Sequence, residues 1–112
     1  MDCIFCKIAA GEIPSTKVYE DDTVVAFNDL DPQAPVHVLI IPKEHIASAA
    51  EINESNSAVV AHIFEVAAKI VAEKGLKDGF RIVNNCGDSA GQSVKHLHFH
   101  LMGGRDFGWP AG

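Results

Sequence analysis

Apolar and polar positions divide this chain into segments whose spacing predicts helices and strands. The longest helical pattern spans residues 55–74, and Gly75 follows it as a C-cap. A shorter helical pattern spans residues 3–11, which Gly11 and then Pro14 close. In the long pattern, apolar side chains recur every three or four positions and form one stripe: Val60, Ile63, Phe64, Ala67, Ile70 and Val71. We therefore expect one long and one short helix.

Four other segments are rich in β-branched, aromatic and other apolar residues, which favour strands. These segments are 17–28, a hairpin with its turn at 20–22; 37–41, a central strand ended by Pro42; 80–85; and 96–102. The segments 29–35 and 86–94 carry proline, glycine and polar residues and predict loops. Strands on both sides of one long helix, joined by short connections, predict an antiparallel sheet of the α+β class.

Length and composition narrow the classes of protein that fit. A chain of 112 residues predicts a single domain over residues 1–112, and 47% hydrophobic with 21% charged residues is typical of a soluble globular protein. The net charge of −6 argues against non-specific nucleic-acid binding, which needs clustered Lys and Arg. With no apolar run of the roughly 20 residues that span a bilayer and no signal peptide, we expect no membrane association.

The segment His96-Leu97-His98-Phe99-His100 places histidine at every second position. On a strand, alternate side chains share a face roughly 6.6 Å apart, so the three imidazoles should line one face while Leu97, Phe99 and the following Leu101 enter the core. Any one of these histidines alone would more often be a surface or hydrogen-bonded residue. Three on one face indicate a site that supplies a nucleophile, a proton carrier or metal ligands.

Two kinds of chemistry fit this histidine motif. A His-x-His pair can chelate a catalytic zinc ion with a third ligand from elsewhere. The preceding Gly91-Gln92-Ser93-Val94 favours phosphate instead, because small residues with backbone N–H groups and a hydroxyl can form an anion-binding nest. A phosphoryl group held there would face His98.

The chain contains three cysteines, Cys3, Cys6 and Cys86, which is not the even count of a disulfide framework. A reducing cytoplasm is therefore the expected location. There the Cys3-x-x-Cys6 pair is either half of a metal site or a redox pair, and a thioredoxin-like strand and helix around it are missing from the pattern.

Beyond the histidines, motifs along nearly the whole chain resemble the histidine triad (HIT) family. They are Ile4-Phe5-Cys6-Lys7-Ile8, Gly11-Glu12-Ile13-Pro14, Ala26-Phe27-Asn28-Asp29, Pro32-Gln33-Ala34-Pro35-Val36-His37, Ile41-Pro42-Lys43-Glu44-His45-Ile46, Gly91-Gln92-Ser93-Val94 and His96-Leu97-His98-Phe99-His100-Leu101-Met102. The ending Gly103-Gly104-Arg105, followed by Trp109-Pro110-Ala111-Gly112, is similar to the Hint branch of that family. Asn28 and residues 84–90 do not follow one fixed family pattern.

This resemblance implies a HIT-like fold with a five-stranded antiparallel sheet and a homodimer in which two sheets join into a continuous ten-stranded sheet. It also implies binding of purine nucleotides such as AMP and GMP. The implied activity is hydrolysis of the P–N bond of nucleoside 5′-phosphoramidates without a catalytic metal. Two alternatives stay open: cleavage of dinucleoside polyphosphates, and a nucleotide- or zinc-dependent interaction protein whose turnover is incidental.

Roles for individual residues also follow from the resemblance. His98 would be the nucleophile that forms a nucleotidyl-histidine, His100 would stabilise charge on the phosphate, and His37 and His96 would support them. Ser93 would complete a phosphate cradle with the backbone of Gly91 and Gln92. The remaining nucleotide contacts would come from Asp29 at the ribose, Asn85 near the phosphate, and Leu30, Phe27 and Ile8 around the base. Trp109 of a second copy would shape the leaving-group pocket.

The resemblance finally implies a structural zinc ion. Family members with this cysteine pair bind zinc through two further histidines, and the matching residues here complete the set Cys3, Cys6, His45 and His96.

Overall fold

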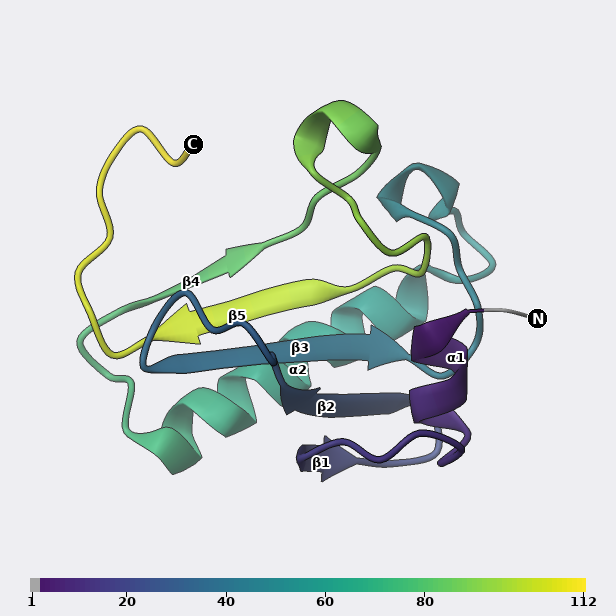
Figure 1. Cartoon of the computed structure of the whole chain (residues 1–112), viewed down its shortest axis with the longest axis horizontal. Helices are drawn as coiled ribbons and strands as arrows, with labels where there is room; N and C mark the ends of the chain where they lie inside the picture. The colour runs from purple at the N-terminus through teal and green to yellow at the C-terminus, as the bar shows by residue number, and fades with distance from the viewer. Residues whose placement is uncertain (1–2) are drawn as a thin grey trace.

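A five-stranded antiparallel sheet forms the centre of the computed structural model, which describes residues 3–112 (Figure 1). In spatial order its strands are β1 (Lys17–Glu20), β2 (Val24–Asn28), β3 (Val36–Pro42), β5 (Phe99–Gly103) and β4 (Phe80–Val83). Every neighbouring pair is antiparallel. The predicted α+β class and antiparallel sheet are thereby confirmed.

Two helices cover opposite faces of this sheet. The long helix α2 (Ser57–Lys74) runs behind the sheet in Figure 1, and the short helix α1 (Ile4–Ala9) lies in front of it, at one end of β2 and β3. Two short 3-10 helices, η1 (Ala49–Glu51) and η2 (Asp88–Ala90), interrupt the loops. Among residues 3–112, no helix is both long and apolar enough to cross a membrane.

The hydrophobic core has one part on each side of the sheet. On the α2 side it includes Leu97, Phe99 and Leu101, which are 0%, 8% and 0% exposed, so their predicted burial is confirmed. On the α1 side, Phe5 and Ile8 pack against alternate residues of β2 and β3. Because β3 is covered on both faces, its sequence is apolar from Val38 to Pro42, as expected for a central strand.

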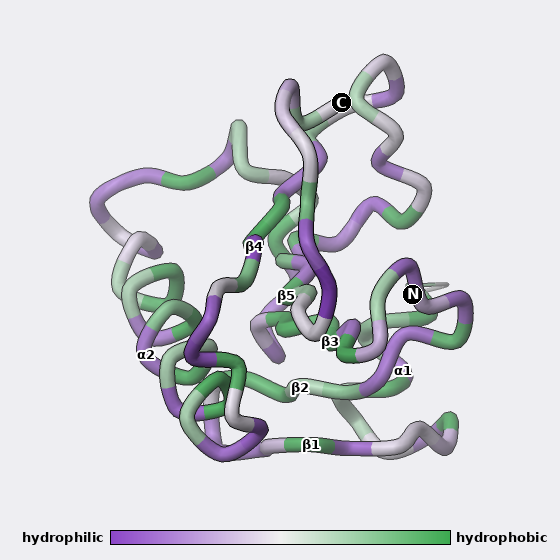
Figure 2. The backbone as a smooth tube through the Cα atoms, turned by 90° about the vertical axis from the view of Figure 1, so that its left-hand side faces the viewer, coloured by the Kyte–Doolittle hydropathy of each residue, from purple (hydrophilic) through white to green (hydrophobic). Residues whose placement is uncertain are grey.

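Helix α2 begins two residues later than its sequence pattern predicts. The side-chain oxygen of Asn53 accepts hydrogen bonds from both the N–H and the hydroxyl of Ser55, which holds the chain in a turn there. Figure 2 shows the alternation of hydrophobic and hydrophilic residues along the helix. Phe64, placed in the predicted stripe, is 47% exposed, whereas Val66 outside it is 2% exposed.

The histidine strand is shorter than predicted, because β5 begins at Phe99 and leaves His96 and His98 before it. Pairing with β3 ends at Ile40 and Phe99, two residues before Pro42. The carbonyl of Pro42 instead accepts a hydrogen bond from the ring of His96. Strand β4 likewise ends at Val83 rather than at residue 85, and the Asn84 amide donates to the carbonyl of His98.

Candidate active site and metal centre

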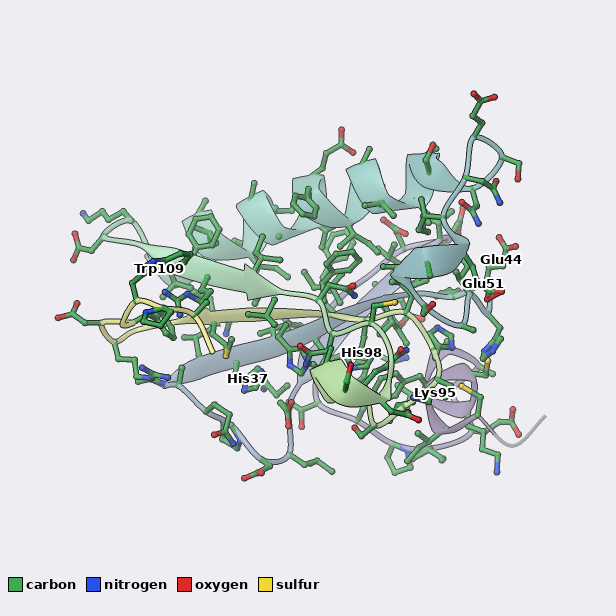
Figure 3. The ribbon with its side chains drawn as sticks, turned by 90° about the horizontal axis from the view of Figure 1, so that it is seen from above. His37, Glu44, Glu51, Lys95, His98 and Trp109 are labelled. Atoms are coloured by element: carbon green, nitrogen blue, oxygen red, sulfur yellow. The ribbon has the colours of Figure 1, made fainter. Side chains whose placement is uncertain are left out.

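The histidines of the motif divide between two neighbouring groups. His96 lies with Cys3, Cys6 and His45 in a group that we term the Cys/His cluster. His100 lies instead beside His37 and Asp29. Figure 3 shows His37 and His98 on the face of the sheet opposite α2.

His37 and His100 form a direct hydrogen bond whose direction follows from the backbone. The N–H of Gln33 donates to His37 Nδ1 over 2.9 Å, so that nitrogen carries the lone pair and Nε2 carries the proton. His37 Nε2 lies 2.9 Å from His100 Nδ1 and therefore donates to it. The remaining proton of a neutral His100 is then on Nε2. The carboxylate of Asp29 lies 3.4 Å from His37 Nε2 and adds negative charge beside the pair.

The tautomer of His98 is fixed in the same way. Its Nδ1 lies 2.7 Å from the carbonyl oxygen of His96, which can only accept, so Nδ1 carries the proton. The Nε2 lone pair of His98 is therefore available to an electrophile. The His98 ring meets the rings of Phe5 and His100 edge to face, with 5.1 Å between centroids in both pairs.

Burial keeps the supporting imidazoles uncharged. It lowers the pKa of His100 to about 4, and the nearby His98 and His37 add to that effect against the opposing charge of Asp29. Burial also lowers the pKa of His37, although Asp29 and Asp31 partly oppose this. At neutral pH both rings are neutral, so each can donate one hydrogen bond and accept another.

A pocket of about 290 Å³ opens beside His98 and His100. Apolar side chains from α1, β2, β3 and the adjoining loops line it, among them Phe5, Ile8, Ile13, Phe27 and Leu39. Polar groups from Asp29, Ser93, His98 and His100 also line it. Apolar walls with a few convergent polar groups are typical of a small-molecule site.

The Cys/His cluster draws its ligand atoms from three parts of the chain. Cys3 and Cys6 flank the first turn of α1, His45 follows β3, and His96 precedes β5. Cys3 Sγ lies 3.3 Å from His96 Nδ1, Cys6 Sγ lies 3.3 Å from His45 Nδ1, and the two Nδ1 atoms are 3.2 Å apart. All four ligand atoms lie within 4.8 Å of one another.

These spacings match a tetrahedral zinc site. Zinc–sulfur bonds of about 2.3 Å and zinc–nitrogen bonds of about 2.0 Å put ligand atoms roughly 3.3 to 3.8 Å apart. His96 Nε2 donates to the Pro42 carbonyl over 2.8 Å, which leaves the Nδ1 lone pair facing the cluster. Burial lowers the pKa of His96 and so keeps that nitrogen unprotonated. The donor set therefore fits zinc, with all four positions supplied by protein.

The structure brings together many, but not all, of the residues assigned from the sequence. Ile8, Phe27, Asp29, Leu30, Ser93, His98 and His100 all line the pocket, and His37 lies behind His100. Asn85, Gly91 and Gln92 are not among the described residues that line it. The buried side chain of Gln92 instead holds its loop, donating to the carbonyls of Ala47 and Val94 and accepting from the N–H of Gly87.

Among the described residues, Phe5 lines the pocket of its own copy, whereas Trp109 does not. Trp109 is 86% exposed and lies toward the opposite end of the sheet from His98 in Figure 3. Phe5 received no role from the sequence, yet its ring contacts both His96 and His98. The signals that could have found it were its position between two cysteines in a short apolar helix and its place in the family motif Ile4-Phe5-Cys6-Lys7-Ile8.

Comparisons with known proteins agree with this arrangement. A family model described as scavenger mRNA decapping enzyme C-terminal binding matches residues 2–107. A HIT-like protein of Synechococcus elongatus is 49% identical over 111 residues, covering 99% of this chain and 97% of that relative. A 14 kDa zinc-binding protein of Zea mays is 48% identical, covering 97% of this chain and 87% of that protein.

A solved structure gives the same result. The HIT family hydrolase of Legionella pneumophila superimposes with a TM-score of 0.97 at 49% identity, covering 99% of this chain and 100% of that one. Fold, histidine geometry and sequence thus agree, and the chain belongs to the histidine triad family.

Proposed function

We propose that this protein is a nucleotide-binding hydrolase that cleaves the P–N bond of purine nucleoside 5′-phosphoramidates, with His98 as the nucleophile. The observation that carries the proposal is the 2.7 Å hydrogen bond from His98 Nδ1 to the His96 carbonyl, which leaves Nε2 unprotonated beside the pocket. The hydrolase name of the Legionella pneumophila protein supports hydrolysis in general.

The reaction proceeds in two displacements at phosphorus. In the first, His98 Nε2 forms a bond to phosphorus while the P–N bond to the amine breaks, and the amine leaves with a proton that solvent supplies through the Ser93 hydroxyl. In the second, water attacks phosphorus, its proton passes to solvent, and the bond to His98 breaks. The products are the amine and a nucleoside monophosphate.

The surrounding groups stabilise the charge that develops. His100, with its proton on Nε2, donates to a phosphate oxygen, and His37 holds His100 in that tautomer from behind. Asp29 accepts hydrogen bonds from the ribose, while Ile8, Phe27 and Leu30 enclose a purine such as that of AMP or GMP. Asn85 and the backbone of Gly91 and Gln92 assist at the phosphate if their loop adjusts when nucleotide binds.

A structural zinc ion belongs to the same proposal, held by Cys3, Cys6, His45 and His96. When bound, it supplies a cross-link between α1 and the segments beside it, because four protein ligands leave no open position for substrate. The zinc-binding name of the Zea mays relative supports this assignment.

We further propose a homodimer in the cytoplasm. In it, two sheets join into a continuous one, and Trp109 of a second copy shapes the leaving-group pocket. The 86% exposure of Trp109 supports this role, because an indole that is so accessible is available to another chain.

Intact-protein mass spectrometry tests the function directly. After brief mixing with adenosine 5′-phosphoramidate, the mass should rise by one adenylyl group, and His98→Asn should abolish the adduct while retaining AMP binding. An adduct that persists in His98→Asn would refute the assigned nucleophile. Turnover of diadenosine polyphosphate by the same preparation, faster than turnover of the phosphoramidate, would favour the polyphosphate alternative.

A further inference from the structure

The Cys/His cluster and the nucleotide pocket share the short helix α1. Phe5 lies between the two cysteine ligands in the sequence and is only 7% exposed. Its ring meets the ring of His98 edge to face, 5.1 Å between centroids, and that of His96 at 6.0 Å. One aromatic side chain therefore contacts both a cluster ligand and the proposed nucleophile.

A second connection runs through the main chain of His96. Its ring is held on one side by the cluster and on the other by the Pro42 carbonyl. Its own carbonyl oxygen accepts the 2.7 Å hydrogen bond that fixes the tautomer of His98. A displacement of the His96 ring therefore moves the acceptor on which the orientation of His98 depends.

Without a metal ion, α1 is held to the sheet by the packing of Phe5 and Ile8 and by the contacts between its cysteines and the cluster imidazoles. Helix α1 has only six residues, too few for a helix to be stable by itself in water. The cluster then brings two thiols and two imidazole lone pairs within 4.8 Å without a cation to attract them. A bound zinc ion would form one bond to each of the four ligand atoms and anchor both ends of the first turn of α1.

We propose that zinc at the Cys/His cluster strengthens nucleotide binding, because it fixes His98 and the α1 wall of the pocket through Phe5 and His96. Phe5 is thereby assigned as a positioning residue. The inference rests on the proposed nucleotide function, and it adds a thermodynamic link between two separate ligands. Linkage requires the effect to be mutual, so nucleotide must strengthen zinc binding by the same factor.

Calorimetry with AMP tests the link. We expect the zinc-loaded chain to bind AMP at least about 5-fold more tightly than the chain stripped by a chelator. Competition with a chromophoric chelator should show AMP tightening zinc binding by the same factor. As a second readout, imidazole nitrogen NMR should show that zinc increases the fraction of His98 with its proton on Nδ1. Circular dichroism verifies that the stripped chain is folded. If it is unfolded, the variant His45→Ala serves as the zinc-depleted form in its place, because His45 is exposed and its removal leaves the core intact.

Substitution of Phe5 tests the route of the coupling. In Phe5→Leu the four ligands remain, so zinc still binds, but the ratio of AMP affinities with and without zinc should fall toward one. The matched control is Ile8→Val, which also alters an α1 residue that lines the pocket and should retain the ratio. Cys86→Ser, which removes a thiol outside the cluster, should retain it as well.

The outcomes separate this inference from the function on which it rests. Equal AMP affinity with and without zinc, or a chain that does not bind zinc, overturns the link while the hydrolase proposal stands. A Phe5→Leu variant that keeps the full ratio overturns the assigned route. Failure of AMP to bind either form refutes the nucleotide function itself, and the link with it.

Discussion

His96 and His100 come from one short motif, yet the structure gives them different chemistry. His96 is fully buried, and its Nδ1 faces two thiols and a second imidazole. His100 accepts a hydrogen bond from His37 and lies near a carboxylate. Their backbone positions are four residues apart, so the motif alone does not set these roles. What each imidazole can do depends on the partners that other segments bring to it.

Distances between ligand atoms make the contrast quantitative. Four of the distances between ligand atoms in the Cys/His cluster run from 3.2 to 3.5 Å, close to the edges of a tetrahedral zinc site of roughly 3.3 to 3.8 Å. In the second group, His37 and His100 approach to 2.9 Å, while Asp29 lies 4.0 Å from His100. The first spacing suits a metal shared by all members, and the second suits a hydrogen bond between two neutral rings.

The prediction with the largest expected effect concerns enzymatic activity, and it distinguishes the His37–His100 group from the Cys/His cluster. His100→Ala removes the donor that we propose for the phosphate, so kcat for a phosphoramidate should fall by about 10²- to 10³-fold. Zinc content should stay at one ion per chain, since none of the four cluster ligands changes. Steady-state kinetics and metal analysis of the same preparation check this prediction. Loss of zinc from His100→Ala would show that the two groups are not separate.

Cys6→Ser provides the converse test. It removes one of the proposed zinc ligands but leaves His37, His98 and His100 in place, so zinc binding should weaken strongly while the proposed catalytic histidines remain. Because metal binding to a structural site contributes directly to folding, we expect the melting temperature of the zinc-loaded protein to fall by about 5 °C or more. Calorimetric melting with and without a chelator measures this. A variant that melts like the parent chain would mean that zinc does not stabilise the fold.

The two groups also show which features of the fold can be predicted from the sequence and which cannot. Alternation placed Leu97, Phe99 and Leu101 in the core correctly, because burial on a sheet follows a two-residue period. The same alternation could not show that the strand starts only at Phe99. Just before that boundary, the Pro42 carbonyl accepts a hydrogen bond from the ring of His96, a contact across 54 positions of sequence.

The candidate site likewise has features that local sequence patterns could identify and features that they could not. Local spacing identified the cysteine pair and the histidine row, but only the family resemblance linked Cys6 to His45, 39 positions away. Phe5 was missed because its importance lies in which rings surround it, and no local pattern encodes that. The role proposed for Trp109 needs a second chain, which residues 3–112 of a single copy cannot supply.

A third histidine, His62, gives the smallest expected effect and extends the comparison to a ring that is only partly buried. Its Nε2 lies 2.6 Å from Asp21 and its Nδ1 lies 3.1 Å from Glu65. Hydrogen bonds to Asp21 and then to Glu65 raise the pKa of His62, the reverse of the shift that burial causes at His100. The protonated ring thus stabilises the fold fully below its unfolded pKa, and this contribution is lost as pH rises through the higher folded pKa.

His62→Gln should therefore lower the free energy of unfolding at pH 5.5 by about 0.5 to 1 kcal/mol, since the pair is partly exposed and screened by solvent. At pH 9 the difference from the parent chain should be smaller. Urea unfolding at the two pH values measures it, and Asp22→Asn serves as the control for a neighbouring carboxylate. An equal loss at both pH values would mean that His62 acts by packing alone. One rule accounts for the opposite pKa shifts of His62 and His100: neighbouring carboxylates favour the imidazolium, and burial opposes it. An equal loss would show that this rule does not explain the contribution of His62 to stability.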